Sequence, residues 1–143
     1  IGAAAAIDYK AQDFVAEVSL LTGGTGVAVV LDMVGGDYLV RNLACLADEG
    51  RHVSIATQRG THCELPIVEV MRRRLHLTGS TLRPRTLKFK AAIADELKRT
   101  VWPFVESGQL RPVLDLSFPL AEASAAHARM EAGDHVGKIL LLP

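Results

Sequence analysis

The chain has 143 residues, enough for one compact domain or for a part of a larger protein. Hydrophobic residues make up 49% and charged residues 22%, and the 16 Lys and Arg balance the 16 Asp and Glu. This composition argues against a disordered chain and against a basic nucleic-acid-binding surface, and no apolar run reaches the roughly 20 residues of a membrane span.

The cysteines and the first residues of the chain narrow the class of protein further. Cys45 and Cys63 lie far apart and form no metal-binding pair, so we expect a cytoplasmic chain with reduced thiols and without zinc. The sequence starts inside an Ala-rich run, without an initiator Met or a signal-peptide pattern. We therefore expect it to be part of a longer protein.

Aliphatic, strand-like runs alternate with helical patterns along the chain. Asp13 can cap the first helix, and Leu39, Leu43 and Leu46 recur at helical spacing in the second. Helices are predicted over residues 13–23, 37–50, 66–74, 85–108 and 120–130. Strands are predicted over residues 27–31, 52–57, 75–82, 112–118 and 138–142.

The alternation of strands and helices predicts an α/β fold with a parallel sheet. The continuous run 27–31 is typical of a strand buried on both faces, and the long helix over 85–108 is expected to cover one face of the sheet. The last three elements form a strand-helix-strand tail. The sequence contains no internal repeat.

In an open parallel sheet, ligands bind beyond the carboxyl ends of the strands. The first three predicted strands end in segments 32–36, 55–60 and 80–83, which combine small and polar residues. Such residues let a flat cofactor approach main-chain N–H and C=O groups. The alternative is purely structural, because turns in any α/β sheet are rich in Gly, Ser and Thr.

Several polar residues have a structural interpretation that we favour. Asp32 is expected to accept hydrogen bonds from N–H groups of the following loop. The arginine run 72–74 is interpreted as a basic helix end rather than as a site for RNA or phosphate. Solvated or core-edge roles, rather than metal binding, are expected for His52, His62, His76 and His127.

A series of motifs resembles one known family from end to end. The motifs are GAAAAIDY at 2–9, VLDMVGG at 30–36, LADEGRHVSIA at 46–56, STLRPR at 80–85, PVLDLSFPLAEASAAHARME at 112–131 and HVGKILLL at 135–142. In order and spacing they resemble the C-terminal part of the zeta-crystallin-like quinone oxidoreductases, in the medium-chain dehydrogenase/reductase superfamily of zinc-type alcohol dehydrogenases.

The resemblance implies a partial Rossmann-like sheet whose first strands lie outside this sequence. Residues 1–110 would form the second half of an NAD(P)-binding domain, and residues 111–143 a tail that returns to the catalytic domain. Residues 3–9 would be a strand without its usual neighbours. The strand 75–82 would lie at the other edge of the sheet, where relatives join into homodimers.

The resemblance also implies positions that contact the cofactor. Tyr9, Met33 and Val34 would border the adenosine, and His135 would reach a phosphate or ribose. The backbone that meets the nicotinamide half would belong to Ile55, Ala56, Thr57, Ser80, Thr81 and Leu82. Many relatives have Gly in place of Ala56, and its methyl group would narrow the approach to the cofactor.

The implied activity is hydride transfer from NADPH, with NADH as a possible substitute, to a small quinone or enone without a metal. The Gly-rich turn that cradles the pyrophosphate is absent from this sequence. No catalytic residue is assigned, because the substrate-binding residues of the family precede this segment. The alternatives are a non-catalytic nucleotide- or RNA-binding relative and a purely structural module.

Overall fold

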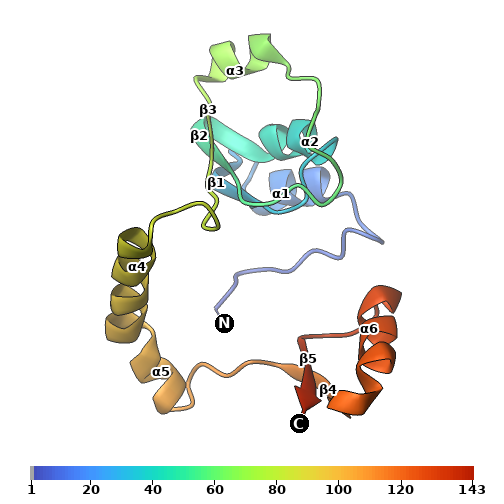
Figure 1. Ribbon diagram of the computed structural model, residues 1–143. Helices are drawn as coiled ribbons and strands as arrows, with labels where there is room; N and C mark the ends of the chain where they lie inside the picture. Colours follow the sequence, from blue (N-terminus) through green and yellow to red (C-terminus); the bar gives the residue numbers. More distant parts are fainter. Residues whose placement is uncertain (1) are drawn as a thin grey trace. The chain divides into compact units, whose positions relative to one another are not determined.

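The computed structural model describes residues 2–143 and divides into two compact units, one up to Arg85 and one from Thr86 onward (Figure 1). The predicted domain boundary after residue 110 differs from this division and remains a prediction about the parent protein.

The first unit contains a three-stranded parallel sheet in the order β1-β2-β3. The strands are β1 (Val27–Asp32), β2 (Leu46–Ser54) and β3 (His76–Gly79). The helices are α1 (Phe14–Leu21), α2 (Tyr38–Cys45) and α3 (Ile67–Arg73). The predicted α/β class and the parallel pairing of the first three strands are confirmed. Residues 3–9 belong to neither sheet.

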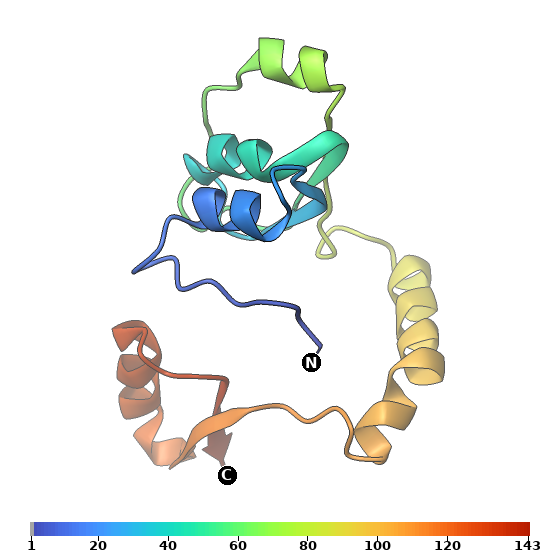
Figure 2. The same ribbon diagram turned by 180° about the vertical axis from the view of Figure 1, so that it is seen from behind.

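The core of this unit lies where α2 and α3 pack on the sheet. Leu43 and Leu46 are almost fully buried, and Leu75 joins them. The partly buried residues around them are Val27, Val30, Leu39 and Val70. Helix α1 packs on α2, and the two helices lie side by side in both views of the ribbon (Figure 2).

The prediction that the first strand is buried on both faces is wrong for this chain. Val30 packs against the core, but Val29 and Leu31 are 56% and 63% exposed. Side chains alternate between the faces of a strand, so the face opposite the core carries these two residues.

The predicted boundary between the second helix and the second strand lies too far toward the C-terminus. Helix α2 ends at Cys45, and Leu46 already pairs with Val27 in β2. The pairing then jumps to Arg51 opposite Val29, so residues 47–50 bulge out of the ladder. At the other end, β2 stops at Ser54 and β3 stops at Gly79, short of the predicted 57 and 82.

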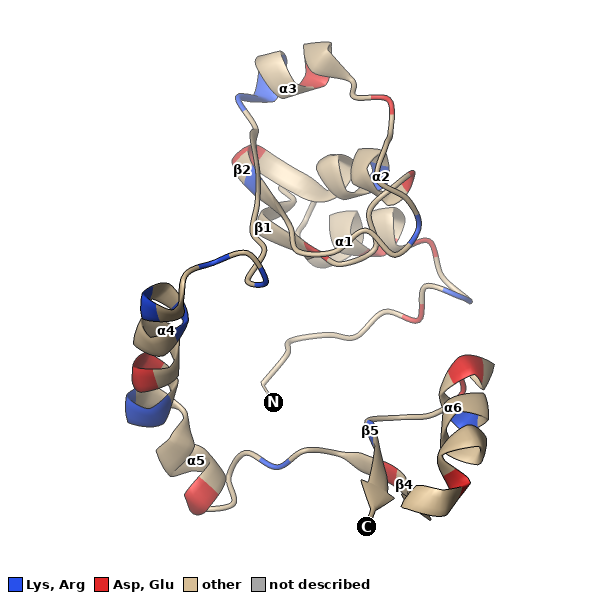
Figure 3. Ribbon diagram, in the orientation of Figure 1, with Lys and Arg blue, Asp and Glu red and all other residues tan. Residues whose placement is uncertain are grey.

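The arginine run closes α3 as the sequence predicted. Arg72 pairs with Glu69 at 2.8 Å, Arg73 lies 3.3 Å from Asp48, and Arg74 pairs with Glu49. Arg73 also donates to the carbonyl groups of Leu43 and Leu46, where α2 ends. The basic residues of α3 thus face acidic residues of β2 (Figure 3) and serve the fold.

The second unit begins with α4 (Leu87–Thr100) and α5 (Trp102–Glu106). The sequence predicted one helix here. Pro103 explains the break, because its ring clashes with the carbonyl of the residue four positions earlier and offers no N–H. The apolar residues Ile93 and Leu97 of α4 are 38% and 49% exposed in this chain. The expected cover of a sheet face stays a prediction.

The tail folds as a strand-helix-strand unit. Strands β4 (Leu114–Pro119) and β5 (Lys138–Leu142) pair in parallel and flank the short 3₁₀ turn η1 (Leu120–Glu122) and α6 (Ala123–Ala132). Arg129 of α6 donates two hydrogen bonds to Asp115 of β4, at 3.0 and 3.2 Å. This bidentate pair fastens the helix to the sheet.

Candidate functional site

The carboxyl ends of the three parallel strands are level with one another. Asp32 lies opposite Ser54, and Ser54 lies opposite Gly79. The pairing continues one residue further, since Ile55 donates its N–H to the Asp32 carbonyl at 2.8 Å and Ser80 donates to Ser54 at 2.9 Å. The three loops therefore leave the sheet side by side, as the sequence predicted for its cofactor-contact segments.

The Asp32 side chain organises the first of these loops. Its Oδ1 accepts hydrogen bonds from the N–H groups of Val34 and Gly35, at 2.7 and 3.1 Å. Its Oδ2 lies 3.2 Å from Nε2 of His52 on β2. Asp32 is 3% exposed and His52 is 1% exposed. The interpretation of Asp32 as a strand end that satisfies loop N–H groups is confirmed.

The loops after β1 and β2 are locked together by backbone contacts. Arg59 donates its N–H to the Val34 carbonyl at 2.8 Å, and Gln58 donates to the Met33 carbonyl at 3.4 Å. Gly36 adopts a left-handed φ of 57°, and a Cβ there would lie 2.6 Å from the Arg59 carbonyl oxygen. Glycine is required at this position because the second loop occupies the space.

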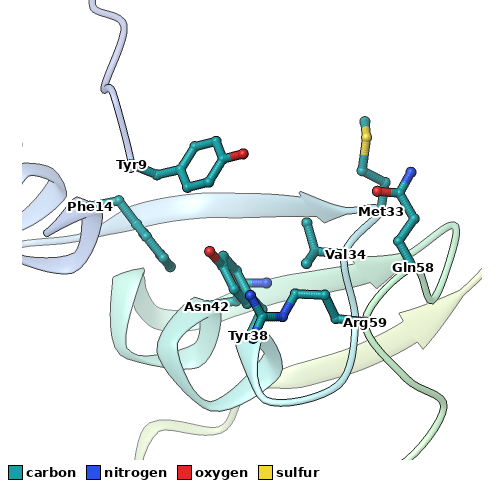
Figure 4. A pocket seen from close by; sticks show the side chains of 8 residues that line it. All are labelled: Tyr9, Phe14, Met33, Val34, Tyr38, Asn42, Gln58 and Arg59. Carbon is teal, nitrogen blue, oxygen red and sulfur yellow. The ribbon is translucent and has the colours of Figure 1, made fainter. Parts of the chain in front are cut away.

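A pocket of about 530 Å³ opens beside these two loops (Figure 4). Such a volume lies in the usual range for small-molecule sites. Its walls come from the N-terminal segment, α1, α2 and the two loops. The lining residues are Tyr9, Phe14, Met33, Val34, Tyr38, Asn42, Gln58 and Arg59.

The helical wall of the pocket is an aromatic pair between two arginines. The rings of Phe14 and Tyr38 stack with centroids 5.7 Å apart and planes inclined by 15°. The Arg41 guanidinium lies 4.2 Å from the Phe14 centroid, and that of Arg59 lies 5.3 Å from the Tyr38 centroid. These contacts hold the rings in place by stacking and cation–π attraction.

Both arginines are also anchored by carboxylates. Arg41 pairs with Asp13 at 2.7 Å, and this hydrogen bond holds the pKa of Asp13 below its ordinary value. Arg59 lies 3.3 Å from Asp37 in a more exposed pair. Arg59 is the cation among the residues that line the pocket. The pocket thus combines flat apolar walls, the two side-chain amides of Asn42 and Gln58, and one positive charge.

The structure brings together three of the residues singled out from the sequence, Tyr9, Met33 and Val34. The segments 55–57 and 80–82 lie at the same edge of the sheet but do not line this pocket. His135 belongs to the second unit, where its Nδ1 atom is buried without a hydrogen-bond partner among the described residues.

Sequence reasoning assigned no cofactor contact to five residues that line the pocket, although two of them lie in the strand-end segment 55–60 where a ligand was expected. They are Phe14, Tyr38, Asn42, Gln58 and Arg59. Two signals pointed to four of them: an aromatic residue opens each of the first two helices, and the second strand-end segment contains Gln58 and Arg59 before its glycine.

A family model described as zinc-binding dehydrogenase matches residues 1–141. The chain belongs to this family. The resemblance read from the sequence motifs is thereby confirmed, and the site described above lies at the carboxyl edge of the parallel sheet of a member of this family.

Relatives in this family carry reductase names. A 2-haloacrylate reductase from a Burkholderia species is 34% identical over 141 residues, 96% of this chain and 41% of the relative. A quinone oxidoreductase from Pseudomonas aeruginosa is 34% identical over 149 residues, 99% of this chain and 43% of the relative. A solved mycobacterial protein in complex with NADPH matches with a TM-score of 0.76 and 31% identity, over 99% of this chain and 44% of that one. The chain spans less than half the length of these relatives.

The family description raises the question of zinc. Within residues 2–143, no three His, Cys, Asp or Glu side chains gather closely enough to hold a metal ion. A zinc site needs three or four such ligands, so this part of the protein does not fit the metal.

Within residues 2–143, no helix has the length and apolarity to cross a membrane.

Proposed function

We propose that the chain is the C-terminal, nucleotide-binding part of a cytoplasmic NADPH-dependent oxidoreductase that reduces a quinone or another activated alkene without zinc. The observation that carries the proposal is the pocket at the carboxyl edge of the parallel sheet, where dinucleotides bind in such folds. The reductase names of relatives and the NADPH complex of a solved neighbour support it.

The pocket is proposed to take the adenosine end of the cofactor. An adenine ring is flat and apolar on its faces, which suits the wall of Val34 and Tyr38. Its edges carry hydrogen-bonding atoms that the amides of Asn42 and Gln58 can meet. Tyr9 and Arg59 also line the pocket and are proposed to meet a ribose or its phosphate, since a phosphate favours the cation of Arg59.

The nicotinamide half is proposed to lie along the two following strand ends. When bound, this half of the cofactor supplies the hydride for the reduction. The backbone at the strand ends would orient it, and the methyl of Ala56 narrows the approach. The residues concerned are Ile55, Ala56, Thr57, Ser80, Thr81 and Leu82. His135 is proposed to contact a phosphate or ribose.

The binding proposal is tested by calorimetric titration of ADP-ribose into this chain. Replacing Met33 with Ala removes one wall of the pocket, and we expect about fivefold weaker binding from the lost apolar contact. Met71→Ala is the matched control, because Met71 is 71% exposed on α3 and does not line the pocket. Equal weakening by both variants, or no binding by the wild-type chain, would refute the site.

The catalytic proposal is tested on the longer protein that contains this chain. We expect it to oxidise NADPH in the presence of a small quinone, and NADH more slowly. Tight RNA binding without turnover would favour the alternative of a non-catalytic relative instead.

A homodimer through the edge strand is the proposed assembly. All four residues of β3 are exposed, and the strand pairs with β2 on one side. An open strand edge carries free N–H and C=O groups that can pair with a second copy. Light scattering should give twice the monomer mass, and a monomer at working concentration would refute the dimer.

A further inference from the structure

We infer that His52 is a positioning residue for the nucleotide pocket, acting through the carboxylate of Asp32. The inference rests on the proposed function, since it assigns the buried His52–Asp32 pair to the geometry of that same pocket. His52 does not line the pocket itself.

The position of His52 is unusual for the strand that carries it. In the register of the sheet it lies opposite Val30, on the face that packs against the core. Strands of a parallel sheet are normally filled with aliphatic residues at such positions. A fully buried imidazole there requires a polar partner, and the Asp32 carboxylate 3.2 Å away supplies it.

The pairing also supplies a hydrogen-bond donor that the buried Asp32 carboxylate needs. A carboxylate removed from water needs hydrogen-bond donors for both oxygens. The loop N–H groups of Val34 and Gly35 serve Oδ1, and Nε2 of His52 serves Oδ2. Because a carboxylate can only accept, the imidazole nitrogen is the donor in this contact.

From Asp32 the contacts run directly to the pocket. The two N–H groups that Asp32 holds fix the turn in which Met33 and Val34 line the wall. The carbonyls of these two residues accept the N–H groups of Gln58 and Arg59, which line the same pocket. One buried carboxylate therefore holds the backbone of four lining residues in position, and His52 fixes the orientation of that carboxylate.

The test compares three variants of His52. His52→Leu removes the donor. His52→Gln keeps an N–H group at the reach of Nε2, and His52→Asn carries one that is a methylene too short. We expect ADP-ribose binding to weaken about tenfold in the Leu and Asn variants, which matches the loss of a charge-assisted hydrogen bond. The Gln variant should restore binding to within about threefold.

Hydrogen exchange without ligand provides the second readout. In the Leu and Asn variants, the amides of Val34 and Gly35 should exchange about tenfold faster, because their acceptor is no longer held. Leu75→Ala is the control for general loss of stability, since Leu75 is a core residue that does not line the pocket. It should lower stability while leaving ADP-ribose affinity unchanged.

The outcomes separate this inference from the proposed function. If the wild-type chain binds ADP-ribose and the Leu variant binds it equally well, His52 is not a positioning residue. If the Leu variant fails to fold, equal affinity of the Asn and Gln variants overturns the inference. An affinity loss in Leu75→Ala as large as in His52→Leu also overturns it. If the wild-type chain binds no ADP-ribose, the proposed function fails, and the role of His52 in a nucleotide pocket fails with it.

Discussion

Replacing Gly36 with Ala tests the contact that locks the two pocket loops. Gly36 has a φ of 57°, and an added Cβ would lie 2.6 Å from the carbonyl oxygen of Arg59. That oxygen belongs to the backbone, so the contact cannot be relieved by rotating a side chain. The loop that carries Gln58 and Arg59 has to move away.

The expected loss of unfolding free energy in Gly36→Ala has two parts. A left-handed conformation costs a residue with a Cβ about 1–2 kcal/mol. Relief of the overlap requires the loop to shift, which adds about 1–3 kcal/mol as for other overpacked sites. We therefore expect Gly36→Ala to lower the free energy of unfolding by about 2–5 kcal/mol and to weaken ADP-ribose binding.

Gly23 provides a matched control for the backbone part. Its φ is 58°, and a Cβ there would meet no atom within 4 Å. Gly23→Ala should therefore lower the free energy of unfolding by about 1–2 kcal/mol and leave ADP-ribose affinity unchanged. Urea denaturation and calorimetric titration measure both quantities. Equal destabilisation by the two variants would show that the loops are not in contact at Gly36.

Three further predictions concern the core, an ion pair and the thiols. Leu43→Ala, which empties the centre of the first core, should cost about 2–5 kcal/mol in urea denaturation, and a loss below about 1 kcal/mol would contradict the packing. The hydrogen bond from Arg129 holds the pKa of Asp115 below its ordinary 3.8, so this carboxylate stabilises the fold above that pH. The contribution is lost as the pH falls through the lowered pKa, and urea midpoints of Asp115→Asn should lack this acid dependence. Burial raises the pKa of the Cys45 thiol, so a thiol reagent at neutral pH should label the exposed Cys63 first and Cys45 after unfolding. Equal labelling rates would refute this.

The order of the elements was predictable because each rests on a local pattern, but their ends were not. Leu46 has the spacing of a helical face with Leu39 and Leu43, and it is buried as that spacing implies. The same burial is achieved by the first residue of a strand, and pairing with Val27 decides for the strand. The spacing of apolar residues along the chain does not reveal tertiary pairing of this kind.

The candidate site was predictable where it depends on the backbone and not where it depends on packing. Met33 and Val34 follow from the rule that ligands lie beyond strand ends. Phe14 and Tyr38 reach the pocket because α1 packs on α2 and their rings stack, which no spacing within one helix reveals. For His52 the sequence predicted a solvated or core-edge role. Its buried partner Asp32 lies 20 positions away in the sequence, so no local pattern reveals the pair.

The pocket and the remaining proposed contacts differ in what they require of the protein. All eight residues that line the pocket lie between Tyr9 and Arg59, within the first unit. Its walls are joined by the Asp32 hydrogen bonds and the loop contacts at Gly36, so the lining of the pocket is complete within this unit. His135 belongs to the second unit, so its proposed contact with a phosphate or ribose needs both units to meet the same cofactor. ADP-ribose is therefore the ligand that tests the pocket of this chain by itself, whereas the nicotinamide half tests the assembled enzyme.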